Sequence, residues 1–369
     1  MECIISKEAL LQPLQLVTGV VERRQTLPIL SNALIVVSED KLSITGTDLE
    51  VELVAWGTPQ SVVTTGAVTT PARKLMDICR SLPDEAVIQL KLEENRLLVK
   101  SGRSRYRLSL LPVDDFPQTE QKSSDIEFPL AQSALKNLID SISFAMAQQD
   151  VRFYLNGLLM EVGENRIRTV ATDGHRLALC NGELVEGDVS GPITQVIIPR
   201  KGAVELSRLL NDSDAVANVT MGANFVRVGT DDFLFSSKLV DGKFPDYQNV
   251  IPTGGDKELI AERRLLKDSF VRASILSSDK FHGVRLYLSD QLLKLKANNP
   301  EQEEAEEDIE VDYSGDAVEI GFNVTYMIDV MNTLSSDKIR ITLSGPDNGV
   351  IIEREDNPDA LYVVMPMKI

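Results

Sequence analysis

Cysteine, histidine and aromatic residues are scarce in this 369-residue sequence, which has three cysteines, two histidines, one tryptophan and 5% aromatic residues in all. Cys3, Cys79 and Cys180 are too few and too scattered for a disulfide framework, so we expect reduced core residues. No apolar run approaches the roughly 20 residues that a membrane helix needs. The first residues lack a basic segment ahead of an apolar one, so we expect a cytoplasmic protein with no membrane partner.

The motifs that commonly carry catalysis are also missing. The sequence contains no His-Glu-x-x-His, no Gly-x-Ser-x-Gly, no phosphate-binding P-loop and no dinucleotide fingerprint. Asp173 and His175 could form an acid/base pair, but no nucleophile is marked beside them. A hydrolase that uses this pair therefore stays a minor alternative, and we expect no catalytic residues, no metal and no cofactor.

The net charge of −18 argues against nucleic acid unless the charges are segregated, because phosphate binding needs Lys and Arg. The sequence does separate them: acidic residues crowd the predicted strands and loops, and many basic residues fall on or beside predicted helices. These basic residues are Lys7, Arg23, Arg24, Arg73, Arg80, Lys136, Arg200, Lys201, Arg208, Lys267 and Arg272. A positive helical face on an acidic protein is therefore possible.

An internal repeat organises the chain. Thr47-Asp48 and Thr172-Asp173 each follow an alternating run that predicts a strand, and a weaker third copy ends at Asn299. Pro71 and Pro199, and likewise Phe116-Pro117 and Phe244-Pro245, recur at a spacing of 128 residues. We therefore predict three similar domains, at residues 1–125, 126–256 and 257–369.

Each repeat combines helices with antiparallel hairpins, which indicates an α+β fold. The apolar periodicity predicts helices over residues 7–17, 71–81, 131–146, 199–210, 263–275 and 324–334. Ser6 is expected to cap the first helix. In two repeats, a pair of basic residues seven positions apart shares one face of the second helix, Arg73 with Arg80 and Lys201 with Arg208.

The two ends of the chain carry opposite charge. Residues 101–107 are basic through Arg103, Arg105 and Arg107, whereas residues 301–310 hold seven carboxylates in a run that we read as helix-like. The acidic run could be a solvated face or a site for a hard cation, although it lacks the glycine turn of a calcium loop. Complementary ends also favour head-to-tail association, which closes a ring or forms a filament.

Several segments together resemble the bacterial sliding clamp family, the β subunit of DNA polymerase III. They are residues 172–177 (Thr-Asp-Gly-His-Arg-Leu), 101–105, 244–247, 297–307 and 362–367, so the resemblance spans the whole chain. It implies a head-to-tail homodimeric ring of six similar domains, with helices lining the interior and antiparallel sheets outside. It also implies a partner in duplex DNA, enclosed without base readout.

The resemblance also assigns three sets of residues. Duplex DNA contacts are implied for Arg24, Arg73, Gln149, Tyr154, Lys201 and Arg208. The dimer interface would join Lys74, Arg96, Arg103, Arg105, Tyr106 and Leu108 to Ile275, Leu276, Glu301, Glu303, Glu304 and Glu307 of the other subunit. A pocket for partner peptides would be formed by Leu155, Thr172, Gly174, His175, Arg176, Leu177, Pro245, Val250, Asn323, Tyr326, Val350, Met365, Pro366 and Met367.

We therefore expect a non-enzymatic processivity clamp that tethers a replicative polymerase, clamp-loader subunits and repair proteins to DNA through short peptide motifs. Gln248-Asn249 departs from the family, which often has an arginine there, so partner preference can differ. A monomeric acidic scaffold that binds proteins without DNA is the other alternative.

Overall fold

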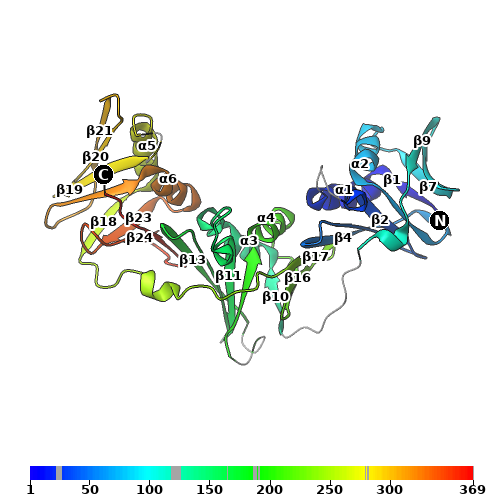
Figure 1. The fold of residues 1–369 in the computed structure, drawn as a ribbon, viewed down its shortest axis with the longest axis horizontal. Coiled ribbons are helices and arrows are strands. Elements are labelled where there is room, and N and C mark those ends of the chain that lie inside the picture. The colour runs from blue at the N-terminus through cyan, green and yellow to red at the C-terminus, as the bar shows by residue number, and fades with distance from the viewer. Residues whose placement is uncertain are drawn as a thin grey trace. The chain divides into compact units, whose positions relative to one another are not determined.

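A computed structural model describes residues 1–21, 27–117, 126–163, 165–185, 189, 192–278, 280 and 282–368. The chain forms two compact units, each described here by itself. The first unit is Met1–Leu135 with Val204–Leu239, and the second is Lys136–Ala203 with Val240–Ile369. Figure 1 shows the elements along the chain, and all of them belong to helices and antiparallel sheets, which confirms the predicted α+β class.

The first unit contains an eight-stranded sheet of order β10-β15-β16-β17-β4-β3-β2-β6. Its strands are β2 (Asn32–Val37), β3 (Leu42–Thr47), β4 (Val51–Gly57), β6 (Gly66–Pro71), β10 (Ile126–Ala131), β15 (Val216–Met221), β16 (Phe225–Gly229) and β17 (Phe233–Lys238). Half of the strands precede residue 72 and half follow residue 125, and β4 and β17 join the halves. The sheet is therefore shared by two sequence repeats.

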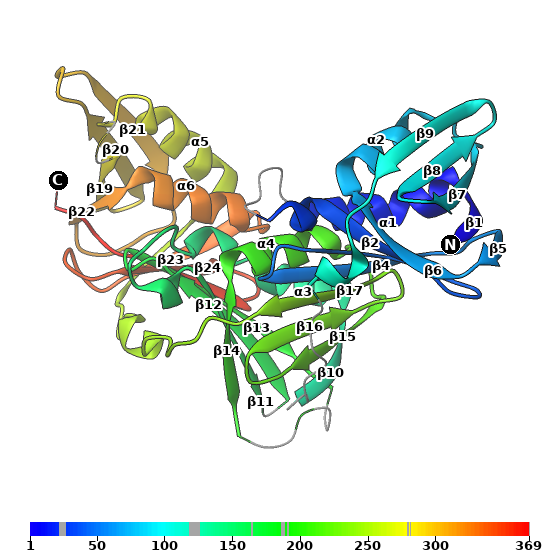
Figure 2. The same cartoon turned by 45° about the vertical axis from the view of Figure 1, so that its right-hand side comes forward.

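The second unit contains an equivalent sheet of order β18-β23-β24-β25-β13-β12-β11-β14. Its strands are β11 (Gly157–Gly163), β12 (Arg166–Thr172), β13 (Arg176–Glu183), β14 (Thr194–Pro199), β18 (Lys257–Glu262), β23 (Lys338–Leu343), β24 (Val350–Arg354) and β25 (Ala360–Val364). Here β13 and β25 join the two halves, as β4 and β17 do in the first unit. Figure 2 shows both of these sheets.

Each unit also carries a smaller sheet. The first unit has the order β5-β1-β7-β8-β9, and the second has β21-β20-β19-β22. These strands are β1 (Glu2–Ser6), β5 (Ser61–Thr64), β7 (Val87–Glu93), β8 (Arg96–Ser101), β9 (Ser104–Ser109), β19 (Gly283–Ser289), β20 (Leu292–Asn298), β21 (Glu304–Glu310) and β22 (Val318–Asn323). Among the described residues β9 pairs only with β8 and β21 only with β20, so both are edge strands.

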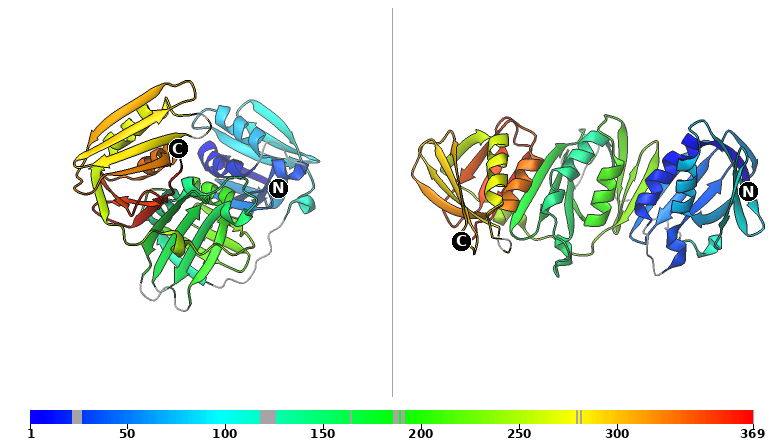
Figure 3. Two further views of the ribbon diagram at one scale, coloured as in Figure 1. Left: turned by 60° about the vertical axis from the view of Figure 1, so that its left-hand side comes forward. Right: turned by 90° about the horizontal axis from the view of Figure 1, so that it is seen from above.

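The helices are α1 (Lys7–Val20), α2 (Ala72–Ser81), α3 (Gln132–Asp140), α4 (Arg200–Leu209), α5 (Arg263–Ser274) and α6 (Val324–Thr333). Helix α1 lies beside α2, and α5 lies beside α6 (Figure 3). Ser6 caps α1 by accepting a hydrogen bond from the amide of Ala9, as predicted. None of the helices in the described part of the chain is long and apolar enough to cross a membrane.

Cations close the carbonyl ends of the paired helices. Arg73, at the start of α2, donates to the carbonyls of Thr18 and Val21 at the end of α1. Lys7, at the start of α1, donates to the carbonyl of Leu82 just after α2. Positive groups are favourable there because the last carbonyls of a helix lack intrahelical partners and carry partial negative charge.

All three cysteines are free and buried, which confirms that they are core residues. Burial raises the pKa of Cys3 and Cys180 to about 11 and that of Cys79 to about 12. A thiol with such a pKa holds almost no thiolate at neutral pH, so these residues are unsuited to nucleophilic chemistry.

Two of the sequence-based element predictions were wrong. Helix α3 ends at Asp140, and the predicted continuation to residue 146 is a short 3-10 turn, Ser143–Ala145. The hydroxyl of Ser143 donates to the carbonyl of Ile139, which is the carbonyl that a continuing helix would offer to the amide of Ser143.

The acidic run is a strand rather than a helix. Residues Glu304–Glu310 form β21 and pair in register with β20. The carboxylates of Glu306 and Asp308 lie 2.5 Å from Nζ of Lys296 and 3.4 Å from Nζ of Lys294, respectively, across the pair. These lysines lower the local repulsion, and side chains alternate along the strand between exposed and partly covered positions, as a two-residue period requires.

Candidate functional site

The repeated Thr-Asp pairs form the same turn twice. In one copy, the Thr172 hydroxyl donates to the Arg176 carbonyl and accepts from the Gly174 amide, and Oδ1 of Asp173 accepts from the amides of His175 and Arg176. In the other copy, Thr47 and Asp48 make the corresponding four bonds. The repeat is therefore a structural turn that closes a hairpin.

This turn uses both carboxylate oxygens of Asp173. Oδ1 accepts from two backbone amides, and Oδ2 accepts from Nε of Arg176 at 3.1 Å. The ring of His175 stacks on that of Tyr326, with 6.4 Å between centroids. Asp173 is thus placed to hold the turn, and the geometry gives the hydrolase alternative no support.

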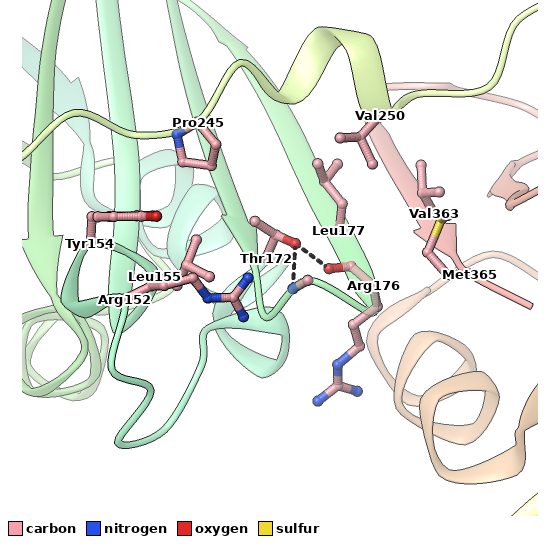
Figure 4. Close-up of a pocket in the computed structure, with 11 residues that line it drawn as sticks. Arg152, Tyr154, Leu155, Thr172, Arg176, Leu177, Pro245, Val250, Val363 and Met365 are labelled. Atoms are coloured by element: carbon pink, nitrogen blue, oxygen red, sulfur yellow. Dashed lines mark hydrogen bonds between the residues drawn. The ribbon is translucent and has the colours of Figure 1, made fainter. Parts of the chain in front are cut away.

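A pocket of about 200 Å³ opens beside this turn (Figure 4). It lies within the second unit and is lined by Arg152, Tyr154, Leu155, Thr172, Gly174, Arg176, Leu177, Pro245, Val250, Val363 and Met365. Most of the lining is apolar, with a few polar groups, which is the usual composition of a ligand site.

Eight of the residues expected in a peptide pocket line this cavity: Leu155, Thr172, Gly174, Arg176, Leu177, Pro245, Val250 and Met365. Tyr154, which the family resemblance assigned to DNA, also lines it. Val363 and Arg152 were not anticipated. The alternation along β25 could have indicated Val363, because it faces the same side of the strand as Met365.

The remaining expected pocket residues have other contacts. Asn323 caps α6 by accepting from the amide of Thr325, and Val350 is fully buried. The amide of Met367 donates to the carbonyl of Gly321, which holds the chain after Pro366 against β22. His175 and Tyr326 stack on each other beside the turn.

The segment that follows residue 243 supplies one wall of the pocket. Phe244 and Tyr247 are buried in an apolar cluster on the sheet, and they hold Pro245 and Val250 at the pocket. The Tyr247 hydroxyl donates to Oε2 of Glu161 at 2.6 Å, and burial together with this carboxylate raises the pKa of Tyr247. The wall is therefore preformed rather than a free linker.

Arg176 is fully engaged within the protein. Its guanidinium donates to Asp173, to Asp329 on α6 at 2.5 Å and to the carbonyl of Phe144, and it lies over the ring of Tyr326. Figure 4 shows the guanidinium directed away from Leu177 and Val250. Arg176 therefore ties α6 to β13 and contributes its stem, rather than its charge, to the pocket.

Arg152 forms the opposite rim and is also paired. It donates to both oxygens of Asp150, at 3.0 and 2.9 Å, and these bonds lower the pKa of Asp150 to about 2. Gly174 has φ of +90°, and a Cβ there would lie 3.3 Å from Nη2 of Arg152. Glycine at this position allows both the left-handed turn and the close approach of Arg152.

The residues expected to contact DNA have varied surroundings, and Arg24 lies outside the described residues. Arg73 holds the end of α1, and Arg208 on α4 pairs with Glu205 and donates to the carbonyl of Leu16 at 3.4 Å. Lys201 lies on α4, and Gln149 lies in an exposed turn with φ of +57°. Arg73 and Arg208 therefore both make contacts within the protein that stabilise the fold.

The residues expected at a dimer interface gather on the two edge strands and next to them. On the basic side, Arg103 lies in the β8–β9 turn, Lys74 is on α2, Arg96 is on β8, and Arg105, Tyr106 and Leu108 are on β9. On the acidic side, Glu304 and Glu307 are on β21, and Glu301 and Glu303 precede it. Ile275, directly after α5, is 74% exposed and is followed by Leu276.

No cluster of His, Cys, Asp and Glu side chains suited to a metal ion occurs within the described ranges. The shared eight-stranded sheets, the repeated helices and the repeated turn define the clamp class of fold, built from three copies of one module. Comparison with known proteins agrees with this class.

Models of the N-terminal, central and C-terminal domains of the DNA polymerase III beta subunit match residues 1–120, 129–246 and 248–368. The Beta sliding clamps of Pseudomonas aeruginosa and Escherichia coli are 53% and 51% identical to the chain, and each comparison covers the full length of both proteins. The chain belongs to the DNA polymerase III beta subunit family, the bacterial sliding clamps, as the sequence resemblance predicted.

Solved structures agree. The DNA polymerase III subunit beta of P. aeruginosa superimposes with a TM-score of 0.98 at 52% identity, covering all of both chains. The subunit from Caulobacter crescentus gives 0.94 at 36% identity, again with full coverage. The three-domain clamp fold and the role of a sliding clamp in DNA replication therefore hold for this chain.

Proposed function

We propose that two copies of the chain join head to tail into a ring that encloses duplex DNA and tethers polymerase, clamp-loader and repair proteins through short peptides. The observation that carries this proposal is the pair of small sheets. Apart from the outer strand β5, their strand orders, β1-β7-β8-β9 and β21-β20-β19-β22, correspond to the two halves of each eight-stranded sheet.

The correspondence predicts which strands meet. In the complete sheets, β17 pairs with β4 and β25 pairs with β13 to join the halves. The equivalent strands in the small sheets are β9 and β21, the two edge strands. A pairing of β9 from one copy with β21 from the next completes an eight-stranded core of the same order, to which β5 adds an outer strand beside β1, and it satisfies both open edges.

Charge supports the same pairing. Strand β9 and the turn before it carry Arg103, Arg105 and Arg107, whereas Glu304 and its neighbours make β21 strongly acidic. Opposite charges steer the two edges together, and like charges oppose the wrong pairing of β9 with β9. The exposed Ile275 next to the acidic edge supplies an apolar contact.

For the DNA-facing surface we propose Arg24, Arg73, Gln149, Tyr154, Lys201 and Arg208, and we infer domain boundaries near residues 125 and 256. A ring needs only weak phosphate contacts, because topology rather than affinity keeps it on DNA. Enclosure reconciles DNA binding with the net charge of −18, since only the inner surface must be positive. The protein would act in the cytoplasm without catalysing a reaction.

We propose the pocket beside Thr172 as the peptide site. Its apolar wall is preformed by Phe244 and Tyr247, and Met365 adds a flexible apolar side chain at the rim. The set remains the one inferred from the family: the eight lining residues with His175, Asn323, Tyr326, Val350, Pro366 and Met367 nearby.

Retention on closed DNA tests the enclosing ring. After loading onto a nicked circle, the protein should survive a high-salt wash and should be released when the circle is cut to a linear form. The variant Arg103→Glu with Arg105→Glu should not be retained even on the intact circle, since its ring cannot close. Equal retention on circular and linear DNA would contradict enclosure.

A further inference from the structure

The chain contains two equivalent junctions between the halves of its eight-stranded sheets, and the peptide pocket described above lies at one of them. The turn at Thr172 and the strands β13 and β25 form the floor of that pocket, and β24 continues the same sheet beside β25. The turn at Thr47 and the strands β4, β17 and β16 form the matching floor in the first unit. The same backbone therefore appears twice, with different side chains.

The registers of the two sheets align the floors residue by residue. One row runs Thr172, Leu177, Val363, Ile351, Thr342 and Glu258 across neighbouring strands. The other runs Thr47, Glu52, Ser236, Arg227, Thr220 and Glu127. The rows agree at both ends and differ only at three central positions, where Leu, Val and Ile are replaced by Glu, Ser and Arg.

The backbone hydrogen bonds and the buried phenylalanines beside the two rows are also alike. The amide of Met365 donates to the carbonyl of His175, and the amide of Lys238 donates to that of Glu50, both at 2.9 Å. Phe116 is buried with Ile29 and Leu30 in the first unit, and its sequence counterpart Phe244 is buried beside the pocket. Among these described residues, the two junctions differ in the central row and its rim.

The replaced residues reverse the chemistry of the floor. Leu177 and Val363 are almost fully buried apolar groups that present a dry surface. In the first unit, Nε of Arg227 lies 3.3 Å from the Ser236 hydroxyl, and Glu52 is next to them in register. An apolar side chain placed over this row would desolvate charged groups without giving them a partner, which is unfavourable.

We propose that the row Glu52, Ser236 and Arg227 determines specificity by closing the first junction to apolar peptides, so that each chain offers one peptide site instead of two. This inference rests on the proposed peptide pocket. Leu49, which replaces Gly174 in the turn, and Lys238, which replaces Met365 at the rim, act in the same direction.

The test is binding stoichiometry, measured by calorimetry on the full chain. The probe is an N-acetylated pentapeptide ending in Leu-Phe, because a largely apolar cavity of about 200 Å³ suits two bulky apolar side chains. The wild type should bind one peptide per chain. The variant with Leu49→Gly, Glu52→Leu, Arg227→Ile, Ser236→Val and Lys238→Met should bind two.

A control variant with Glu52→Gln, Arg227→Lys and Ser236→Thr keeps the row polar and should still bind one. The reverse exchange, Leu177→Glu, Ile351→Arg and Val363→Ser, should weaken binding at the second junction by about 100-fold. This exchange supplies an independent readout if the variant with five substitutions does not fold. Circular dichroism checks the folding of both variants.

The outcomes separate the two proposals. A wild type that binds no peptide would overturn the pocket itself. If the wild type binds one peptide and the variant with five substitutions folds but also binds only one, the proposed role of the row Glu52, Ser236 and Arg227 is overturned. A reverse exchange that folds and binds like the wild type would do the same.

Discussion

At the scale of single residues, the two turns differ in one position that matters. Leu49 and Gly174 both follow a Thr-Asp pair, and they adopt φ of +79° and +90°. An L-residue with a side chain is strained in this region, whereas glycine is not. The turn at Thr172 is therefore relaxed and open to Arg152, and the turn at Thr47 tolerates strain.

We predict opposite effects for reciprocal substitutions. Gly174→Ala should lower the free energy of unfolding by about 1 kcal/mol, because the new Cβ is strained and meets Arg152. Leu49→Gly should leave stability unchanged or raise it, since Leu49 is 41% exposed and loses little burial. Urea denaturation measures both. A Gly174→Ala variant as stable as the wild type would show that the positive φ is not maintained in solution.

At the scale of elements, cations on one helix stabilise the end of its neighbour. Arg73 makes two hydrogen bonds to carbonyls at the end of α1, whereas Arg80 on the same helix contacts the sulfur of Met76 at 3.7 Å. The two arginines looked alike in the sequence because both lie on one predicted helix face. The structure gives them different roles.

Arg73→Ala should therefore lower the free energy of unfolding by about 1–3 kcal/mol, because two carbonyls lose a charged donor. Arg80→Ala is the matched control and should change it by less than about 0.5 kcal/mol. Thermal and urea unfolding of the two variants would measure the difference. Equal effects would mean that the Arg73 contacts do not contribute to stability.

The sequence predicted the elements whose side chains alternate with a clear period. The helices near residues 7–17 and 71–81 and the strand Asn32–Val37 follow directly from their apolar spacing. Strand β21 was misread because seven carboxylates masked its two-residue alternation, and the lysines of β20 together with Arg272 of α5 offset the charge of that strand. Such cross-strand partners cannot be identified until the register is known.

The pocket was predictable only in part. Eight lining residues follow from the family resemblance, and Val363 could have been found from the alternation of β25. Arg152 could not have been predicted from the sequence. Its place at the pocket depends on its pairing with Asp150 and on the absence of a side chain at Gly174. Nor could the sequence show that Arg176 is engaged by Asp329, which lies 153 residues away in the chain.

At the scale of the whole molecule, the chain contains two complete eight-stranded sheets and two complementary halves. Completion of the third sheet by a second copy is the central claim, because the ring, the enclosure of DNA and the separation of charge all depend on it. Charge exchange between the edges tests the claim directly, since it can both break the pairing and restore it.

The decisive measurement is sedimentation equilibrium of two variants, alone and mixed. One variant carries Arg103→Glu and Arg105→Glu, and the other carries Glu301→Arg and Glu304→Arg. Each alone should be largely monomeric, because like charges then meet at both interfaces, and an equimolar mixture should form dimers, because opposite charges meet at both. Variants that stay dimeric alone, or a mixture that stays monomeric, would contradict the pairing of β9 with β21.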